Sequence, residues 1–147
     1  MPKKLTKTSV KISPKPHTRS KYYEGVGRRK TAVARVRISS GKGQVDVNGK
    51  DLKGYFKIAR LEKSAIAPLS NLKLDDKFDL TARVKGGGLK AQAEAVKLGL
   101  ARALVLSNGE FKKRLRTLGF LTRDSRMVER KKPGLKKARR APQWKKR

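Results

Sequence analysis

The sequence predicts a small α+β domain, a two-layer sandwich of three or four strands with three helices packed on one face, carrying a basic arm and a long basic tail. Two observations predict this organisation. Strand-like and helix-like apolar periodicities occur between residues 25 and 122. The flanking segments are strongly basic and have few apolar residues. We therefore assign a flexible N-terminal arm to residues 1–24, the globular domain to 25–122 and an extended C-terminal tail to 123–147.

Three segments have the pattern of strands. Residues 31–38 alternate small or apolar with polar side chains, although Val33 fits less well. Residues 44–47 form a second short strand between two turn sequences. Residues 77–85 alternate cleanly, and their core-facing side chains are expected to be Phe78, Leu80, Ala82 and Val84.

Apolar spacings of three and four residues predict two short helices between Asp51 and Leu69. Asp51 is a candidate N-cap, and Gly54 or Lys57 divides the two helices. Pro68 predicts that the second helix ends just before it.

The longest helix is predicted from Leu89 to about Leu106. Gly99 in its middle costs about 1 kcal/mol relative to alanine, so we expect the sheet to approach closely there. A further basic helix is predicted over residues 110–118. The buried stripe of the long helix is expected to contain Leu89, Ala93, Val96, Leu100, Ala103 and Leu104.

The formal net charge of +30 predicts a polyanionic partner, namely a nucleic acid. Residues 126–147 contain eleven Lys and Arg against one acid, with too few apolar residues to form a core, so a polyanion must order them or they stay disordered. Pro133, Gly134 and Pro142 prevent a long helix. Fully extended, these residues would span roughly 70 Å, a reach that suits threading into a large folded nucleic acid.

The composition argues against catalysis, cofactors and metals. The chain has no cysteine, and its only histidine, His17, lies in the arm. Asp75, Asp76 and Asp79 have no histidine or nucleophile near them in the sequence. No run is long enough to cross a membrane. We therefore expect a protein that is not an enzyme and has no membrane partner.

Three basic features are candidate nucleic-acid contacts. The first feature is the group of cations that follows Gly27. A glycine at that position would let the backbone approach a sugar–phosphate chain. The alternative is that these cations are only a solvated strand end. The second lies before the long helix, where exposed amides and glycines favour an anion, although a structural turn is the alternative. In the third, the tail, Trp144 would either stack on a base or pack against the domain. The first two comprise Arg28, Arg29, Lys30, Arg35 and Arg37, and Lys85, Gly86, Gly87, Gly88 and Lys90.

Several ordered motifs carry a resemblance that covers about residues 25–147. They are Gly27-Arg28-Arg29-Lys30 with Ala34-Arg35-Val36, Val84-Lys85-Gly86-Gly87-Gly88, Leu121-Thr122-Arg123-Asp124-Ser125-Arg126, Val128-Glu129-Arg130-Lys131-Lys132, Lys136-Lys137-Ala138-Arg139-Arg140 and Lys146-Arg147. Together they resemble the small-subunit ribosomal protein S-nine family, in its bacterial and organellar branch. Lys90-Ala91 stands where that family usually has a small hydroxyl residue and glycine, and Trp144-Lys145 where it tends to have Phe and Ser.

The resemblance implies a fold like domain two of ribosomal protein S-five, with a left-handed βαβ crossover that is an exception to the usual handedness. It implies a structural constituent of the small ribosomal subunit, placed in the head. The implied partners are small-subunit ribosomal RNA, tRNA in the peptidyl site and neighbouring head proteins, with no homo-oligomer. The implied location is the cytoplasmic ribosome, or alternatively an organellar one.

The resemblance also implies residue roles. The domain cations and glycines given above would bind ribosomal RNA. For the whole protein, composition alone also allows an alternative function, that of a DNA-packaging or chromatin-like protein. The tail would add to the ribosomal RNA contacts with Arg123, Arg126, Arg130, Lys131, Lys132, Lys136, Lys137, Arg139 and Arg140. The phosphates of tRNA would be bound by Lys145, Lys146 and Arg147.

Overall fold

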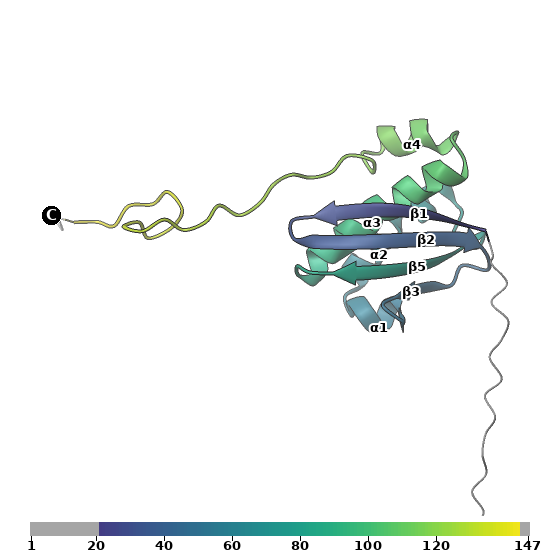
Figure 1. Ribbon diagram of the computed structural model, residues 1–147, viewed down its shortest axis with the longest axis horizontal. Coiled ribbons are helices and arrows are strands. Elements are labelled where there is room, and N and C mark those ends of the chain that lie inside the picture. The colour runs from purple at the N-terminus through teal and green to yellow at the C-terminus, as the bar shows by residue number, and fades with distance from the viewer. Residues whose placement is uncertain (1–20, 145–147) are drawn as a thin grey trace, which may run out of the picture.

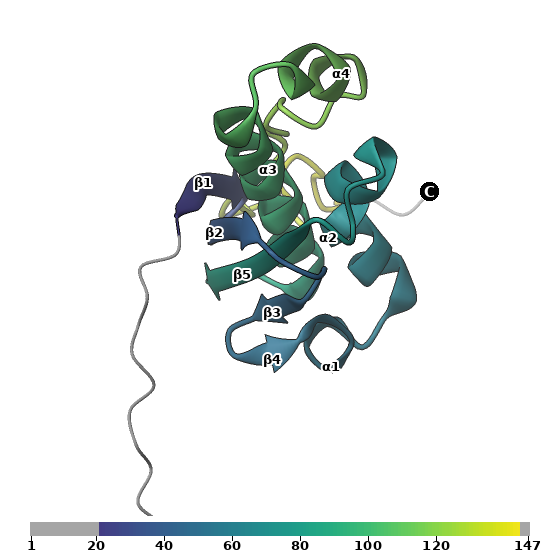
Figure 2. The same ribbon diagram turned by 90° about the vertical axis from the view of Figure 1, so that its right-hand side faces the viewer.

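The structure is a computed structural model that describes residues 21–144. Five strands and four helices occur within this range (Figures 1 and 2). In chain order they are β1 (Tyr22–Arg29), β2 (Ala32–Ser40), β3 (Val45–Val47), β4 (Lys50–Asp51), α1 (Leu52–Phe56), α2 (Ala59–Leu72), β5 (Phe78–Lys85), α3 (Leu89–Ser107) and α4 (Phe111–Thr117).

The strands form one sheet in the order β1-β2-β5-β3-β4. The neighbours β1/β2, β2/β5 and β3/β4 are antiparallel, whereas β3 and β5 are parallel and are joined through β4, α1 and α2. The helices α2 and α3 pack behind the sheet, and the strands present their other face to the viewer in Figure 1. The predicted α+β class is therefore confirmed. The likeness to ribosomal protein S-five and the left-handed crossover stay predictions.

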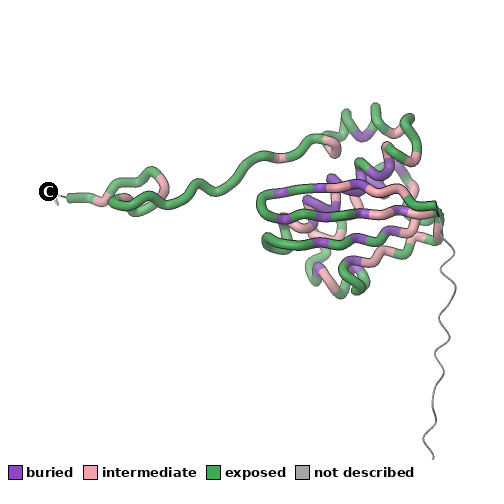
Figure 3. The backbone as a smooth tube through the Cα atoms, in the orientation of Figure 1, coloured by how far each residue is buried: buried purple, intermediate pink, exposed green. Residues whose placement is uncertain are grey.

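The core lies between the sheet and α3. The alternation in β2 and β5 places Ala34, Val36, Leu80 and Ala82 against the helices, as expected. Val33, which fitted the predicted strand less well, also follows the alternation: its side chain is exposed on the face of the sheet opposite the core. Figure 3 shows that buried residues are confined to the domain, while the C-terminal tail is exposed along most of its length.

Strand β1 packs directly on α3 because two of its core-facing positions are glycines. A β-carbon on Gly27 would lie 1.9 Å from the carbonyl oxygen of Ala95, and one on Gly25 would lie 2.2 Å from that of Gly99. Gly99 meets Gly27 from the helix side, as its position in mid-helix predicted. The interpretation of Gly27 as an approach point for nucleic acid is wrong, because this residue is buried against a helix.

Other details differ from the sequence predictions, which gave three or four strands and three helices in place of the five strands and four helices observed. Strand β1 was not predicted, and it begins at Tyr22, within the segment assigned to the arm. Helix α2 continues through Pro68 to Leu72; the proline ring is fully buried, and this packing offsets the missing amide. Asp51 precedes α1 without a side-chain capping bond. Leu89 is 43% exposed because it starts α3 beyond the edge of the core.

Candidate nucleic-acid interface

The first two basic motifs come together at the hairpin end of the sheet. The turn between β1 and β2 carries Lys30 and lies against the glycine triplet, since a β-carbon on Gly86 would stand 2.6 Å from the carbonyl oxygen of Thr31. In the β2–β5 ladder, Lys85 pairs with Val33 beside this turn. Lys30 and Lys90 also line one small hollow of about 70 Å³. Segments about 55 residues apart in sequence therefore present their lysines at one place.

The glycine triplet is both a structural turn and an exposed one. Gly86 and Gly87 have left-handed φ angles of 73° and 67°, which explains why glycines stand there. Gly88 precedes α3, and the Gln92 side chain donates a hydrogen bond to the Gly86 carbonyl (3.1 Å). All three glycines are exposed. The two interpretations from the sequence are thus compatible.

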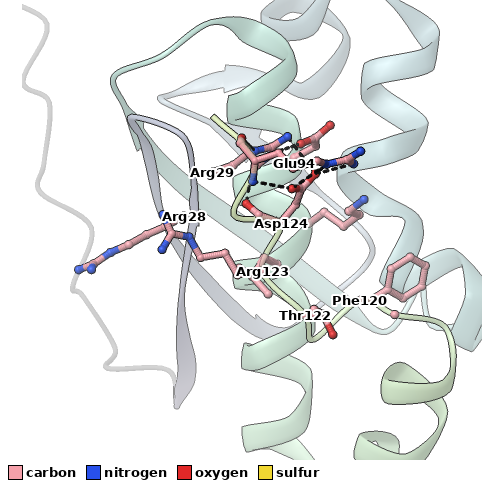
Figure 4. Close-up of a pocket in the computed structure, with 11 residues that line it drawn as sticks. Arg28, Arg29, Glu94, Phe120, Thr122, Arg123 and Asp124 are labelled. Carbon is pink, nitrogen blue, oxygen red and sulfur yellow. Dashed lines mark hydrogen bonds and ion pairs between the residues drawn. The ribbon is translucent and has the colours of Figure 1, made fainter. Parts of the chain in front are cut away.

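Arg29 points toward the helical layer and not to solvent. Its side chain is 11% exposed and forms ion pairs with Glu94 of α3 (2.6 Å) and with Asp124 at the start of the tail (2.9 Å). The same guanidinium donates hydrogen bonds to the carbonyl oxygens of Asp124 (3.3 Å) and Arg126. Arg29 therefore joins β1, α3 and the tail (Figure 4).

Asp124 is held in its charged form. The Arg126 guanidinium and backbone amide both donate to its carboxylate, at distances of 2.9 to 3.2 Å. These bonds, together with the Arg29 charge, hold the pKa of Asp124 well below its usual range. The first turn of the tail is consequently fixed by a chain of charged groups, Glu94–Arg29–Asp124–Arg126.

A cleft of about 280 Å³ opens beside this chain. Figure 4 shows the Arg28 side chain pointing away from the ion pairs, while Arg29 points into them. Since Glu94 and Asp124 are paired, the remaining cations give the cleft a positive lining. Those cations come from β1, α3 and the tail: Arg28, Lys97 and Arg123.

On the open face of the sheet, Arg35 and Arg37 project outward as predicted. Glu24 of β1 accepts hydrogen bonds from both guanidiniums, at 2.9 and 3.0 Å from Arg35 and 2.7 Å from Arg37. The hydrogen bonds from Arg37 and Arg35 lower the pKa of Glu24, and the bond with Glu24 raises the pKa of Arg37. Arg37 also lies over the Tyr22 ring, 4.7 Å from its centroid. Both arginines are thus held in place while their remaining donors face solvent.

The tail has no helix or strand between residues 122 and 144. It runs away from the domain (Figure 1), with one compact loop in which Glu129 pairs with Lys132 (3.2 Å) and Arg139 (2.8 Å). Trp144 is 89% exposed and does not pack on the domain. The predicted ribosomal RNA contacts in the tail, from Arg123 to Arg140, are all exposed. The predicted tRNA contacts Lys145, Lys146 and Arg147 lie outside the described residues.

The sequence did not identify Glu94 and Asp124 as partners of Arg29. The available signal was the alternation itself: if it is continued backward from Ala32 through the hairpin, Gly25, Gly27 and Arg29 fall on the core face. Among residues 21–144, no three acidic or histidine side chains are grouped to hold a metal ion. The search for a membrane-spanning helix in the same range found no candidate.

An α+β domain with clustered surface cations and an exposed basic tail has the features of a nucleic-acid-binding protein. Comparison with known proteins gives the family. Residues 27–147 match the model for ribosomal protein S9/S16. The chain belongs to this family, which makes it a structural ribosomal protein and not an enzyme.

Individual relatives agree with this assignment. The chain is 56% identical over 122 residues to a protein from Cytophaga hutchinsonii named small ribosomal subunit protein uS9, covering 83% of this chain and 95% of the relative. Proteins of the same name from Thermotoga neapolitana and Thermus thermophilus are 56% and 51% identical, covering 85% of this chain and 96% and 98% of the relatives. Similarity over nearly the full length of these relatives favours the ribosomal interpretation over the DNA-packaging alternative.

Proposed function

We propose that this chain, as a structural constituent of the small ribosomal subunit, binds ribosomal RNA in the head with its domain and contacts tRNA in the peptidyl site with the end of its tail. Neighbouring head proteins complete its partners. The family resemblance and the names of the relatives support its place in the small ribosomal subunit. The charge distribution supports RNA as the ligand, because phosphate contacts from Lys and Arg position an RNA-binding protein whatever the base sequence.

One structural observation supports the proposal that the domain and the tail bind different RNAs. The hairpin cations, the glycine turn and the first residues of the tail converge at one end of the domain, where Arg29 fixes the tail's first turn to β1 and α3. From there the exposed tail extends away (Figure 1). If the domain binds ribosomal RNA, its cationic tail therefore begins at a fixed point and can extend to a second ligand, the tRNA. The proposed tRNA contact requires no base recognition, since every tRNA must be accepted.

Deleting Lys145 to Arg147 tests the tail's part of this proposal. We expect purified small subunits that carry the truncated chain to release peptidyl-site tRNA faster, while the chain still sediments with the subunit in a sucrose gradient. A matched control replaces Lys136 and Lys137 by alanine, which removes charge upstream and leaves the end intact. Unchanged tRNA retention by the truncated subunits would contradict the proposed contact. Loss of the truncated chain from the subunit peak would instead show that the end serves assembly.

A further inference from the structure

The open face of the sheet carries more arginine than the sequence motifs indicated. In the β2–β5 ladder, Arg35 stands directly opposite Arg83, and Arg37 stands opposite Thr81. The alternating burial of β2 and β5 places these four residues on the face opposite the core. The helices leave that face of the sheet uncovered (Figures 1 and 2). Two like charges directly across a ladder destabilise a sheet unless an anion lies between them. The register therefore places an unfavourable pair where an anion would relieve it.

Glu24 compensates only part of this charge. Its two carboxylate oxygens accept three hydrogen bonds from Arg35 and Arg37, and it approaches them from the β1 side. Within residues 21–144, the Arg83 side chain makes no ion pair or hydrogen bond. Glu24 therefore pairs with two of the three guanidiniums and fixes them in place, and within the described range Arg83 is left without a carboxylate partner.

Arg83 lines two hollows of the surface. Arg35, Arg37, Thr81 and Arg83 line a hollow of about 60 Å³. A larger groove of about 480 Å³ runs along β5 past Thr81, Arg83 and Lys85 to the Asn48-Gly49 turn. The Asn48 side chain forms the wall of this groove, since it pairs with the backbone of Val84 through bonds of 2.8 and 3.1 Å. A small cationic hollow next to a longer groove suits an anionic group attached to a chain.

We propose that Arg35, Arg37, Thr81 and Arg83 form a phosphate-binding site for a single RNA strand that runs along β5 toward the glycine turn. The inference rests on the proposed function and specifies one of its contacts. Charge complementarity selects a polyanion, and the continuity of the stripe selects a chain: Lys85 follows Arg83 on the same face and leads to Gly86. One isolated phosphate would occupy only the hollow.

Each side chain has a separate role in this site. Arg83, having no protein partner in the described part of the chain, offers its planar fork to two phosphate oxygens. The free donors of Arg35 and Arg37 approach from the neighbouring strand, and the hydroxyl of Thr81, on the same strand as Arg83, donates to the phosphate. Glu24 is a positioning residue, because it fixes the two β2 arginines and does not touch the phosphate.

Salt-dependent binding of the full chain to small-subunit ribosomal RNA tests the site. For Arg83→Ala we expect affinity about fivefold weaker and a slope of log affinity against log salt that is smaller in magnitude by about 0.7, the value for one lost single-strand phosphate contact. Arg83→Lys keeps the charge but not the fork, so its slope should match the parent while its affinity falls. The matched control is Arg60→Ala, which removes an exposed charge from α2.

Parental affinity and slope for Arg83→Ala would overturn the proposal. Equal losses for Arg83→Ala and Arg60→Ala would also overturn it, because overall charge alone would then account for binding. Loss of RNA binding by the Lys30→Ala and Lys90→Ala double variant, without any effect of Arg83→Ala, would remove the sheet site and leave the proposed function intact. Urea unfolding of each variant confirms that the domain is folded.

A photocrosslink identifies the partner that covers this face. Val33 is exposed on the same face, paired with Lys85. A benzophenone amino acid placed at Val33 in intact small subunits is expected to give a crosslinked product that ribonuclease digests. A ribonuclease-resistant product with another protein would overturn the assignment of RNA as the occupant.

Discussion

Replacing Arg29 by alanine tests how the tail is fixed to the domain. The substitution removes two ion pairs and two hydrogen bonds to carbonyl oxygens. Breaking a fully buried ion pair costs about 3–5 kcal/mol. The side chains of Glu94 and Asp124 are 25% and 32% exposed. Water can therefore hydrate both carboxylates once Arg29 is removed, which reduces the loss of stability. We therefore expect the free energy of unfolding to fall by about 2 kcal/mol.

Two measurements separate the domain's share of this effect from the tail's share. Urea unfolding reports the loss of the Arg29–Glu94 pair between β1 and α3 as a lower midpoint at an unchanged slope. Hydrogen exchange of the Arg126 amide, which donates to Asp124 (2.9 Å), reports local release of the tail. We expect that exchange to be about tenfold faster, a change of about 1.4 kcal/mol.

Arg28→Ala is the matched control for Arg29→Ala. Arg28 is the neighbouring arginine, but it is exposed and points away from the ion pairs (Figure 4). Its replacement should change the free energy of unfolding by less than about 0.5 kcal/mol. If Arg29→Ala is as stable as Arg28→Ala, and the Arg126 amide exchanges at the parental rate, the anchoring role of Arg29 is refuted.

Two further predictions concern the β1–α3 contact and the acid sensitivity of the anchor. In urea unfolding, Gly27→Ala should destabilise the domain by about 3 kcal/mol or prevent folding, because the added β-carbon would lie 1.9 Å from the Ala95 carbonyl oxygen. The control Gly54→Ala should be neutral or stabilising in the same assay, because the space around Gly54 is open. Asp124 has a lowered pKa, so its contribution is complete above the usual aspartate value of about 3.9 and is lost only as pH falls through the lowered pKa. The amide resonance of Arg126 should therefore be unchanged at pH 4, and a transition centred there would contradict the anchor.

The sequence predicted those parts of the fold that follow from local periodicity. Strand β5 and helix α3 have unbroken patterns, and the structure places both within two residues of the predicted bounds. Strand β1 was missed because Gly25 and Gly27 occupy positions where a strand normally carries apolar side chains. Glycine is required there by the distance to α3, which no local pattern reveals.

The candidate site was predicted as a set of cations but not as an arrangement. Local chemistry identified the arginines, the glycine turn and the tail. It could not distinguish Arg28 from Arg29, because the partners of Arg29 lie 65 and 95 residues further along the chain. Only the fold shows that one of these adjacent arginines faces solvent and that the other holds the tail.

A photocrosslink from residue 144, at the end of the described tail, tests whether the tail reaches the peptidyl site. A photoreactive amino acid replaces the exposed Trp144, next to the predicted tRNA contacts, in small subunits loaded with peptidyl-site tRNA. We expect a crosslink to the tRNA that disappears when the site is empty. A crosslink only to ribosomal RNA or protein, the same with and without tRNA, would contradict the claim that the tail reaches the peptidyl site.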